Sequence, residues 1–266
     1  MNTYSRLILC VCCFGFLSTS GFAAKPDTAI QHKPDAAEAL SMLRQGNSRF
    51  STGNSRFPHA DTNRISLAGN SDQGRFAFAT VLSCSDSRVP VELLFDAGIM
   101  DIFVVRTAGN LCNGDEIGSI EYGLAHVHTP LLVVLGHSRC GAVAAAVQAA
   151  QGDGHALERN IQPIVNDIIP AVTRAMQLHT NLVGAAILPC AIEENVWHSI
   201  ENLFMQSPAT RILVTNGTVK VVAALYDLAS GIVTWLPDAK TDAILKRIEA
   251  SPAKQTEPFA PLLKHK

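Results

Sequence analysis

The chain has few charged residues, and beyond its N-terminus it has no apolar run long enough to cross a membrane. Charged residues make up 17% of the 266 residues and the net charge is −2, so the basic excess that indicates a nucleic-acid partner is missing. Without a later run of about 18 apolar residues, no internal membrane span is expected. Apolar residues reach 47%, which allows a sizeable core and excludes general disorder.

The one apolar block of note lies close to the N-terminus. Arg6 precedes the short apolar stretch 7–17, and small residues follow it, with Gly21 and Ala23 spaced as before a cleavage site. This pattern predicts a secretory signal peptide over 1–23. The alternative is an uncleaved membrane anchor, for which the block is short. A mobile lead-in is expected over 24–34. The mature protein is predicted to be secreted, or periplasmic in a Gram-negative source, without stable membrane association.

Cysteine is scarce outside that block. Removal of the signal peptide would leave Cys84, Cys112, Cys140 and Cys190. Export favours disulfides, and four cysteines allow three pairings. A Cys84–Cys140 disulfide is one alternative, but it would leave the nearby His137 without a role. Cys112 and Cys190 are expected to be buried thiols, with a disulfide between them as the alternative.

Metal-ligand residues directly follow two apolar, strand-like runs. The run 76–82 precedes Cys84, and the run 131–136 precedes His137 and Cys140. Ligands in open α/β sheets bind at the carboxyl ends of strands, so these three side chains are expected to meet. Two thiolates and one imidazole form a catalytic type of Zn²⁺ site, which has three protein ligands and one open position. The sequence therefore predicts a zinc enzyme.

Two charged residues lie just past the first of these cysteines. Asp86 and Arg88 are two and four residues beyond Cys84, so both side chains can reach the same cavity. Asp86 could act as a fourth zinc ligand or as a base beside the metal. Arg88 could bind it bidentately and keep it away from the metal. The chemistry expected of such a site is attack by zinc-bound hydroxide on a small electrophile.

Strand-like and helix-like segments alternate along the chain. This order predicts an α/β domain with a mainly parallel central sheet flanked by helices and a C-terminal antiparallel strand. A single zinc-dependent catalytic domain is expected over 35–240, followed by a C-terminal helix and loose tail over 241–266. The expected strands are 76–83, 102–106, 131–135, 211–215, 220–226 and 232–236. The expected helices are 35–46, 91–95, 115–126, 142–150, 158–178 and 191–205, with a loop over 53–70.

Four motifs together resemble the β-class carbonic anhydrases. They are Cys84–Pro90, Val104–Asn110, Gly118–Tyr122 and Gly136–Ala142, and their order and spacing match over about residues 38–237. The resemblance implies a β-carbonic anhydrase-like fold and reversible hydration of CO₂ to bicarbonate. It implies Cys84, His137 and Cys140 as zinc ligands, with Asp86 and Arg88 as the catalytic pair and Asp86 as an occasional fourth ligand.

The same resemblance implies a substrate site and a subunit arrangement. The backbone N–H of Gly141 would help to bind substrate, and Phe103 and Tyr122 match positions that line an apolar pocket. Gln73 is assigned to the family's glutamine position, although Arg75 stands at the expected spacing. The family implies a homodimer or homotetramer with the active site near the subunit interface.

Three interpretations of function remain open from the sequence. The preferred one is a carbonic anhydrase, and a second keeps the zinc site but hydrolyses carbonyl sulfide or carbon disulfide. The third is a secreted zinc-binding module with an inactive site, which would have no need for both Asp86 and Arg88. For His126 and His128, a proton shuttle and an ordinary solvated position are the two alternatives.

Overall fold

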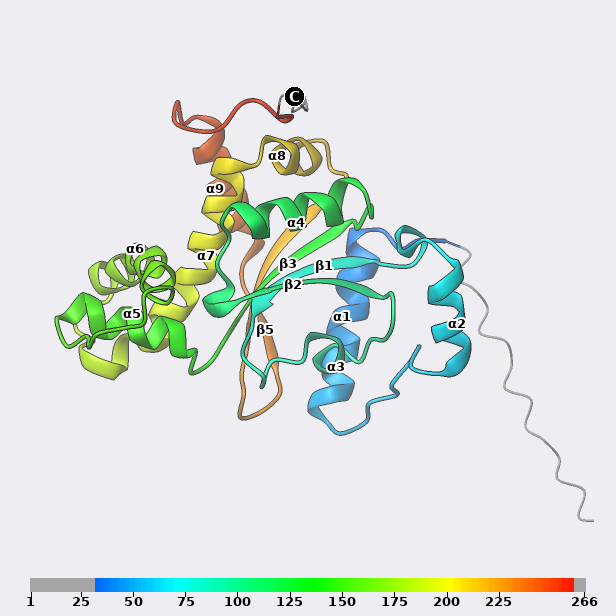
Figure 1. Cartoon of the computed structure of the whole chain (residues 1–266), viewed down its shortest axis with the longest axis horizontal. Coiled ribbons are helices and arrows are strands. Elements are labelled where there is room, and N and C mark those ends of the chain that lie inside the picture. The colour runs from blue at the N-terminus through cyan, green and yellow to red at the C-terminus, as the bar shows by residue number, and fades with distance from the viewer. Residues whose placement is uncertain (1–31, 261–266) are drawn as a thin grey trace, which may run out of the picture. The chain divides into compact units, whose positions relative to one another are not determined.

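A five-stranded sheet runs through residues 32–260, the part of the chain that this computed structural model describes (Figure 1). The strand order is β2-β1-β3-β4-β5. The first four strands are parallel and β5 pairs antiparallel with β4. This arrangement confirms the predicted mainly parallel sheet with an antiparallel C-terminal strand. The strands are β1 Ala79–Cys84, β2 Ile102–Thr107, β3 Leu131–His137, β4 Lys220–Tyr226 and β5 Val233–Trp235.

Helices cover both faces of the sheet, so its central strands β1 and β3 are buried along their whole length and consist mainly of apolar residues. Successive side chains of a strand point to opposite faces. Leu132 and Val134 of β3 therefore pack in one core cluster, which includes side chains of α4, α7 and α9. Leu131 and Val133 pack in a second cluster, with α1 and α3. A third cluster joins α5, α6 and the start of α7 to Cys84 and Cys140, at the carboxyl ends of β1 and β3.

The helices are arranged around this sheet as Figure 1 shows, with α5 and α6 gathered on one side and α2 on the other. Their bounds are α1 Ala36–Ser51, α2 Thr62–Asn70, α3 Val91–Leu94, α4 Gly114–Ala125, α5 Gly141–Gln151, α6 Gln162–Leu178, α7 Leu188–Gln206, α8 Pro208–Thr215 and α9 Asp238–Glu249. Short 3-10 turns are η1 Gln73–Arg75, η2 Ala108–Asn110 and η3 Gly184–Ile187.

Helix α1 begins where the sequence predicts but continues one turn beyond the predicted end. Its start is a capping box, in which Asp35 accepts from the backbone N–H groups of Ala37 and Glu38. Gly46 does not terminate the helix. A Cβ atom at Gly46 would lie 1.8 Å from the carbonyl oxygen of Phe95, so glycine here permits close packing against the segment after α3.

Two further predictions of secondary structure are wrong. The expected loop 53–70 contains α2, which Asp61 caps by accepting from the backbone N–H of Arg64 at 2.8 Å. The expected strand 211–215 is part of α8. Ser207 caps α8 by accepting from Thr210 N–H at 3.0 Å, and a proline stands in its first turn. The β-branched residues of 211–215 indicated a strand, and these start signals outweigh them.

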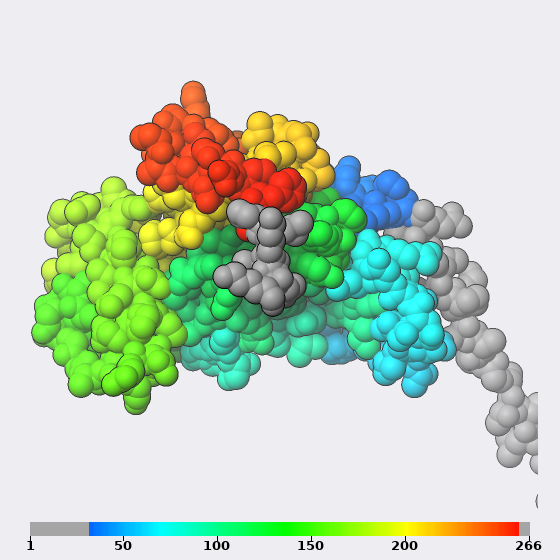
Figure 2. Space-filling model, turned by 45° about the horizontal axis from the view of Figure 1, so that its top comes forward, coloured from blue at the N-terminus to red at the C-terminus, as the bar shows by residue number. Residues whose placement is uncertain are grey.

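The C-terminal segment is fastened to the domain. Arg211 on α8 binds Glu249 of α9 at 2.9 Å and the carbonyl oxygen of Gln255 at 2.5 Å, while the N–H of Gln255 donates to Met205. Figure 2 shows α9 and the following residues beside α8. The tail is therefore not loose as far as residue 255, and the predicted domain boundary at 240 falls inside α9.

The N-terminal predictions fall largely outside the described residues. The signal peptide over 1–23 and most of the lead-in over 24–34 belong to the part of the chain that precedes His32. Between residues 32 and 260, none of the helices has the length and apolar character to span a membrane.

Candidate metal centre and active site

Two neighbouring parallel strands end at the same place and bring three metal-ligand side chains together. Cys84 is the last residue of β1, His137 is the last residue of β3, and Cys140 precedes the first residue of α5. Their donor atoms all lie within 4.8 Å of one another. All three residues are buried, with exposed fractions of 5%, 0% and 1%. The structure thus assembles the ligand set that the sequence predicts.

The imidazole of His137 is oriented for a metal. Its Nδ1 lies 3.0 Å from the carbonyl oxygen of Ser138, which can only accept, so Nδ1 carries the proton. The other nitrogen, Nε2, is buried and has no hydrogen-bond partner within the described part of the chain. An unpaired buried nitrogen is unfavourable unless something binds it, and a metal ion beside the two thiols would do so.

The thiols of Cys84 and Cys140 lie close enough to shift each other's pKa. The pKa of Cys84 is lowered, chiefly because Cys140 donates a hydrogen bond to its thiolate, with further donation from backbone N–H groups such as that of Gly109. The same hydrogen bond, together with burial, raises the pKa of Cys140. Cys84 and Cys140 are both free cysteines, which excludes the alternative of a disulfide between them in this structure. A divalent cation that prefers sulfur and nitrogen, such as Zn²⁺, fits this donor set.

Asp86 and Arg88 form a bidentate ion pair at the exposed side of the metal centre. Arg88 Nε donates to Asp86 Oδ1 at 2.9 Å, and Nη2 donates to Oδ2 at 2.7 Å. The backbone N–H of Arg88 adds a third bond to Oδ1. Arg88 in this pairing holds the pKa of the Asp86 carboxyl well below its usual range. Asp86 is not among the clustered donor atoms, so the structure shows it bound to Arg88.

Two other residues fasten the loops that carry the ligands, and sequence reasoning did not identify them. Arg106 donates to the carbonyl oxygens of Cys84, at 3.0 Å, and of Asp86, at 2.7 Å. Ser138 donates to Asp227 at 2.9 Å and accepts from the N–H of Leu228. A charged residue at the end of an apolar strand, as in Val-Val-Arg106, is the one local signal that pointed to such a role.

The predicted substrate residues fall in two places. Gly141 begins α5 beside Cys140, and a Cβ built there would meet no atom within 4 Å, so space is open next to the metal centre. Phe103 instead pairs with Thr80, four residues before Cys84, and thus about 13 Å along the strand. Tyr122 contacts Phe103 with ring centroids 6.1 Å apart, and Gln73 is exposed in η1, before β1. Within one chain these three side chains do not reach the metal centre.

The remaining candidate residues lie away from this site. His126 stacks on Tyr122 with ring centroids 5.2 Å apart, and His128 follows it, so both precede β3 at the end opposite His137. Cys112 is a buried free thiol, and burial raises its pKa. Cys190 is free and half-buried. The structure therefore supports neither a proton shuttle through the two histidines of one chain nor a Cys112–Cys190 disulfide.

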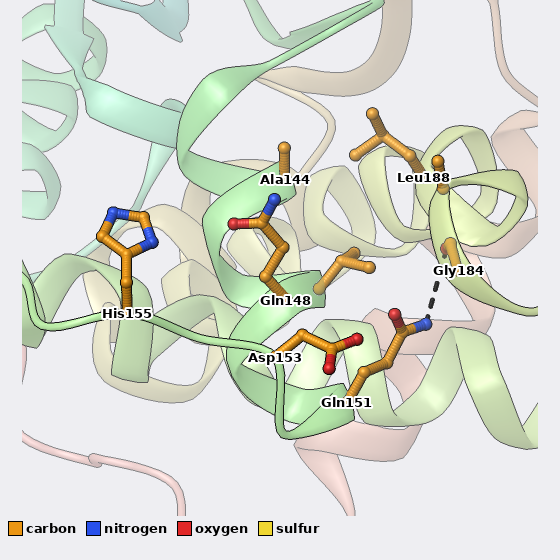
Figure 3. Close-up of a pocket in the computed structure, with 9 residues that line it drawn as sticks. Ala144, Gln148, Gln151, Asp153, His155, Gly184 and Leu188 are labelled. Carbon is orange, nitrogen blue, oxygen red and sulfur yellow. Dashed lines mark hydrogen bonds between the residues drawn. The ribbon is translucent and has the colours of Figure 1, made fainter.

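A cavity of about 450 Å³ lies along the later turns of α5, apart from the three metal-ligand residues (Figure 3). Gln148 and Gln151 from α5 line it, together with Asp153 and His155 from the following loop and Leu188 from α7. Asp153 and His155 are exposed. None of the three metal ligands lines this cavity, so it is not the catalytic pocket.

Comparison with known proteins agrees with this site. The protein family described as carbonic anhydrase matches residues 79–233, which include all three ligands and the Asp86–Arg88 pair. Carbonic anhydrase 2 of Mycobacterium tuberculosis is 34% identical over 194 residues, 73% of this chain and 89% of that protein. A carbonic anhydrase of Mycolicibacterium smegmatis is 34% identical over 195 residues, with 73% and 90% covered. The chain belongs to the β-class carbonic anhydrase family.

Solved β-carbonic anhydrases share its fold. CafA of Aspergillus fumigatus superimposes with a TM-score of 0.58 at 21% identity, over 80% of this chain and 97% of that one. A structure described as one of two tetrameric β-carbonic anhydrases from Sordaria macrospora gives 0.57 at 22% identity, over 75% and 95%. The expected β-carbonic anhydrase-like fold is thereby confirmed.

Proposed function

We propose that this chain is a zinc-dependent carbonic anhydrase that interconverts CO₂ and bicarbonate. The observation that carries the proposal is the buried Cys84–His137–Cys140 cluster, with a free imidazole nitrogen, beside an ion pair already formed between Asp86 and Arg88. An inactive zinc-binding module would have no use for that pair. Zn²⁺ bound by the three ligands would supply the Lewis acidity that lowers the pKa of a coordinated water.

The residues around the cluster have separate roles in this proposal. Arg88 keeps the Asp86 carboxylate ionised and directed away from the three ligands. Asp86 is then free to accept a hydrogen bond from the attacking water and to orient it. The N–H groups in the first turn of α5 have no partner inside the helix, so Gly141 N–H can donate to a substrate oxygen as negative charge develops.

Initial rates of CO₂ hydration, followed by stopped flow with a pH indicator, test the activity. We expect saturable hydration by the zinc-loaded protein, loss of the activity after chelation, and recovery on adding Zn²⁺. Carbonyl sulfide and carbon disulfide serve as the comparison substrates. Hydrolysis of either without CO₂ hydration would reassign the reaction, and a zinc-loaded protein inert toward all three would contradict the proposal.

We also propose that the enzyme is a homodimer or homotetramer whose apolar substrate pocket needs a second copy. Phe103 is half-buried on β2, the edge strand of the sheet in one chain, and Tyr122 beside it is 52% exposed. The two β-carbonic anhydrases of Sordaria macrospora are tetrameric, which supports self-association here. An unpaired strand edge and exposed aromatic rings are features that a second subunit can cover.

Mass in solution and the kinetics of Tyr122→Ala test this arrangement together. We expect at least a dimer by light scattering, and for Tyr122→Ala a lower kcat/KM with unchanged zinc content. The reason is that Tyr122 lies too far from the ligands of its own chain to act there. A fully active monomer, or a Tyr122→Ala variant with wild-type kinetics, would contradict it.

Export is a third proposal. The apolar block 7–17 after Arg6 and the small residues that end at Ala23 support a cleaved signal peptide. Cell fractionation should find the processed protein outside the cytoplasm, beginning near residue 24. Full-length protein in the cytosol would contradict the proposed export and would leave the proposed carbonic anhydrase activity unaffected.

A further inference from the structure

The η2 turn after β2 touches one of the metal-binding thiols through its backbone. Gly109 N–H donates to Cys84 Sγ at 3.3 Å. Gly109 has a positive φ of 73°, and a Cβ there would lie 2.8 Å from Cδ1 of Ile168 and 3.2 Å from Cβ of Ala142. Only glycine suits this backbone conformation at such close quarters, so the N–H approaches the sulfur in a tightly confined turn.

Helix α7 fixes this turn from the other side. Asn195 Nδ2 donates to the carbonyl oxygen of Gly109 at 2.7 Å, and Ser199, one helical turn later, donates to the carbonyl oxygen of Asn110 at 2.9 Å. Asn195 is 0% and Ser199 1% exposed. Because two consecutive carbonyl groups are held, the turn cannot rotate its peptide planes freely. Gly109 thus links Asn195 to Cys84, because its carbonyl oxygen accepts from Asn195 and its N–H donates to the Cys84 sulfur.

The amide oxygen of Asn195, unlike its nitrogen, takes part in no hydrogen bond with the described residues. This atom, Oδ1, is buried. A buried acceptor left unpaired is unfavourable, and an apolar side chain of the same shape would avoid that cost. The donor, which binds the Gly109 carbonyl oxygen, is therefore the part of the Asn195 amide that has a partner.

We propose that Asn195 is a positioning residue for the metal centre, which aims the Gly109 N–H at the Cys84 thiolate. A hydrogen bond to a metal-bound sulfur fixes the direction of its lone pairs and reduces the charge that it donates to the metal. This inference rests on the proposed metal site, and it adds a residue about a hundred positions from the first ligand motif. Asn195 touches neither metal nor substrate in this account; it acts through Gly109.

The test compares Asn195→Leu with Asn202→Leu in the full-length protein. Leucine has nearly the shape of asparagine and lacks the donor. Asn202 lies on the same helix and is partly buried, and its side chain makes a long hydrogen bond to His198, with Nδ2 and Nε2 3.4 Å apart. Three quantities are measured: Zn²⁺ affinity by competition with a chelator, the thiolate-to-metal charge-transfer band of the Co²⁺-substituted protein, and the melting temperature of the metal-free protein.

We expect Asn195→Leu to weaken Zn²⁺ binding by about 10- to 100-fold and to shift the Co²⁺ band. Its metal-free melting temperature should change little, because one unpaired buried acceptor, Asn195 Oδ1, is replaced by another, the Gly109 carbonyl oxygen. Asn202→Leu should leave affinity and spectrum unchanged. Should Asn195→Leu not fold, Asn195→Asp, which keeps the size but replaces the donor with an acceptor, is expected to show the same spectral shift.

Two results would overturn the inference. One is wild-type affinity and an unchanged Co²⁺ band in both Asn195 variants. The other is weakened affinity with an unchanged band and a lower melting temperature, which indicates a merely structural role. A wild-type protein that binds no Zn²⁺ or Co²⁺ through thiolate would instead refute the metal site itself, and the inference with it.

Discussion

Replacing Cys140 by serine is expected to remove most of the bound zinc. The site has three protein donors, and a serine hydroxyl remains protonated where a thiolate binds the metal. Changes to groups that only support metal ligands already cost about 10- to 100-fold in affinity, so loss of a ligand should exceed about 100-fold. Zinc content of the purified protein, by elemental analysis after dialysis, gives the result directly.

Replacing Cys140 by serine should not disturb the start of helix α5. Cys140 is the N-cap residue of α5, with an extended backbone, and serine is among the residues that best cap a helix. The helix should therefore begin at Gly141 as before, and a loss of zinc should reflect the lost ligand. Cys190→Ser is the matched control, since Cys190 is a free, half-buried thiol outside the cluster. Undiminished zinc in Cys140→Ser, or equal loss in both variants, would contradict the ligand assignment.

The meeting of Cys84, His137 and Cys140 could be predicted because it depends on local patterns. An apolar strand followed by a ligand residue places that residue at the sheet edge, and this happens at both Cys84 and His137. Parallel pairing of β1 and β3 then brings the two ends together. The strand at 211–215 was predicted wrongly because its β-branched side chains favour strands, and the helix start at Ser207 and Pro208 outweighs that preference.

The supporting contacts could not be predicted because they join residues far apart in the sequence. Arg106 binds the carbonyl of Cys84 across 22 positions, Asn195 binds that of Gly109 across 86, and Ser138 binds Asp227 across 89. Only Arg106, at the end of an apolar strand, gives a local signal; Asn195 and Ser138 do not differ locally from solvated residues. Their function follows only from the packing of α7 and of the β4–β5 turn against the strand ends.

The substrate pocket shows a different limit. Sequence motifs assigned Phe103 and Tyr122 to it, and the fold places both rings at the far end of β1 and β2 from the ligands. A single chain therefore contains the ligands and the ion pair in one place and the apolar side chains in another. Because one chain cannot place these rings beside its own metal ligands, the proposed pocket can form only if a second chain supplies them.

Arg88→Ala is expected to retain zinc and fold but to lose at least about a hundredfold in the rate of CO₂ hydration. The side chain makes two parallel bonds to Asp86, at 2.9 and 2.7 Å, and is 53% exposed, so its removal leaves no cavity in the core. A carboxylate freed from this pair can turn toward the metal and compete with water for the open position. A positioned acid–base group is worth about 10²–10⁴ in rate, which sets the expected loss.

Asp86→Ala distinguishes the two roles of the pair. An alanine side chain cannot bind the metal, so the open coordination position stays available to water. The rate of CO₂ hydration should still fall, because the carboxylate that orients this water is gone. Arg247→Ala is the matched control, because Arg247 is similarly exposed, at 57%, and pairs with Glu201 at 2.7 Å on α7, away from the cluster. Initial rates are measured beside zinc content for all three variants. If Arg88→Ala hydrates CO₂ at nearly the wild-type rate with full zinc, Arg88 does not control the position of Asp86 and the ion pair is only structural.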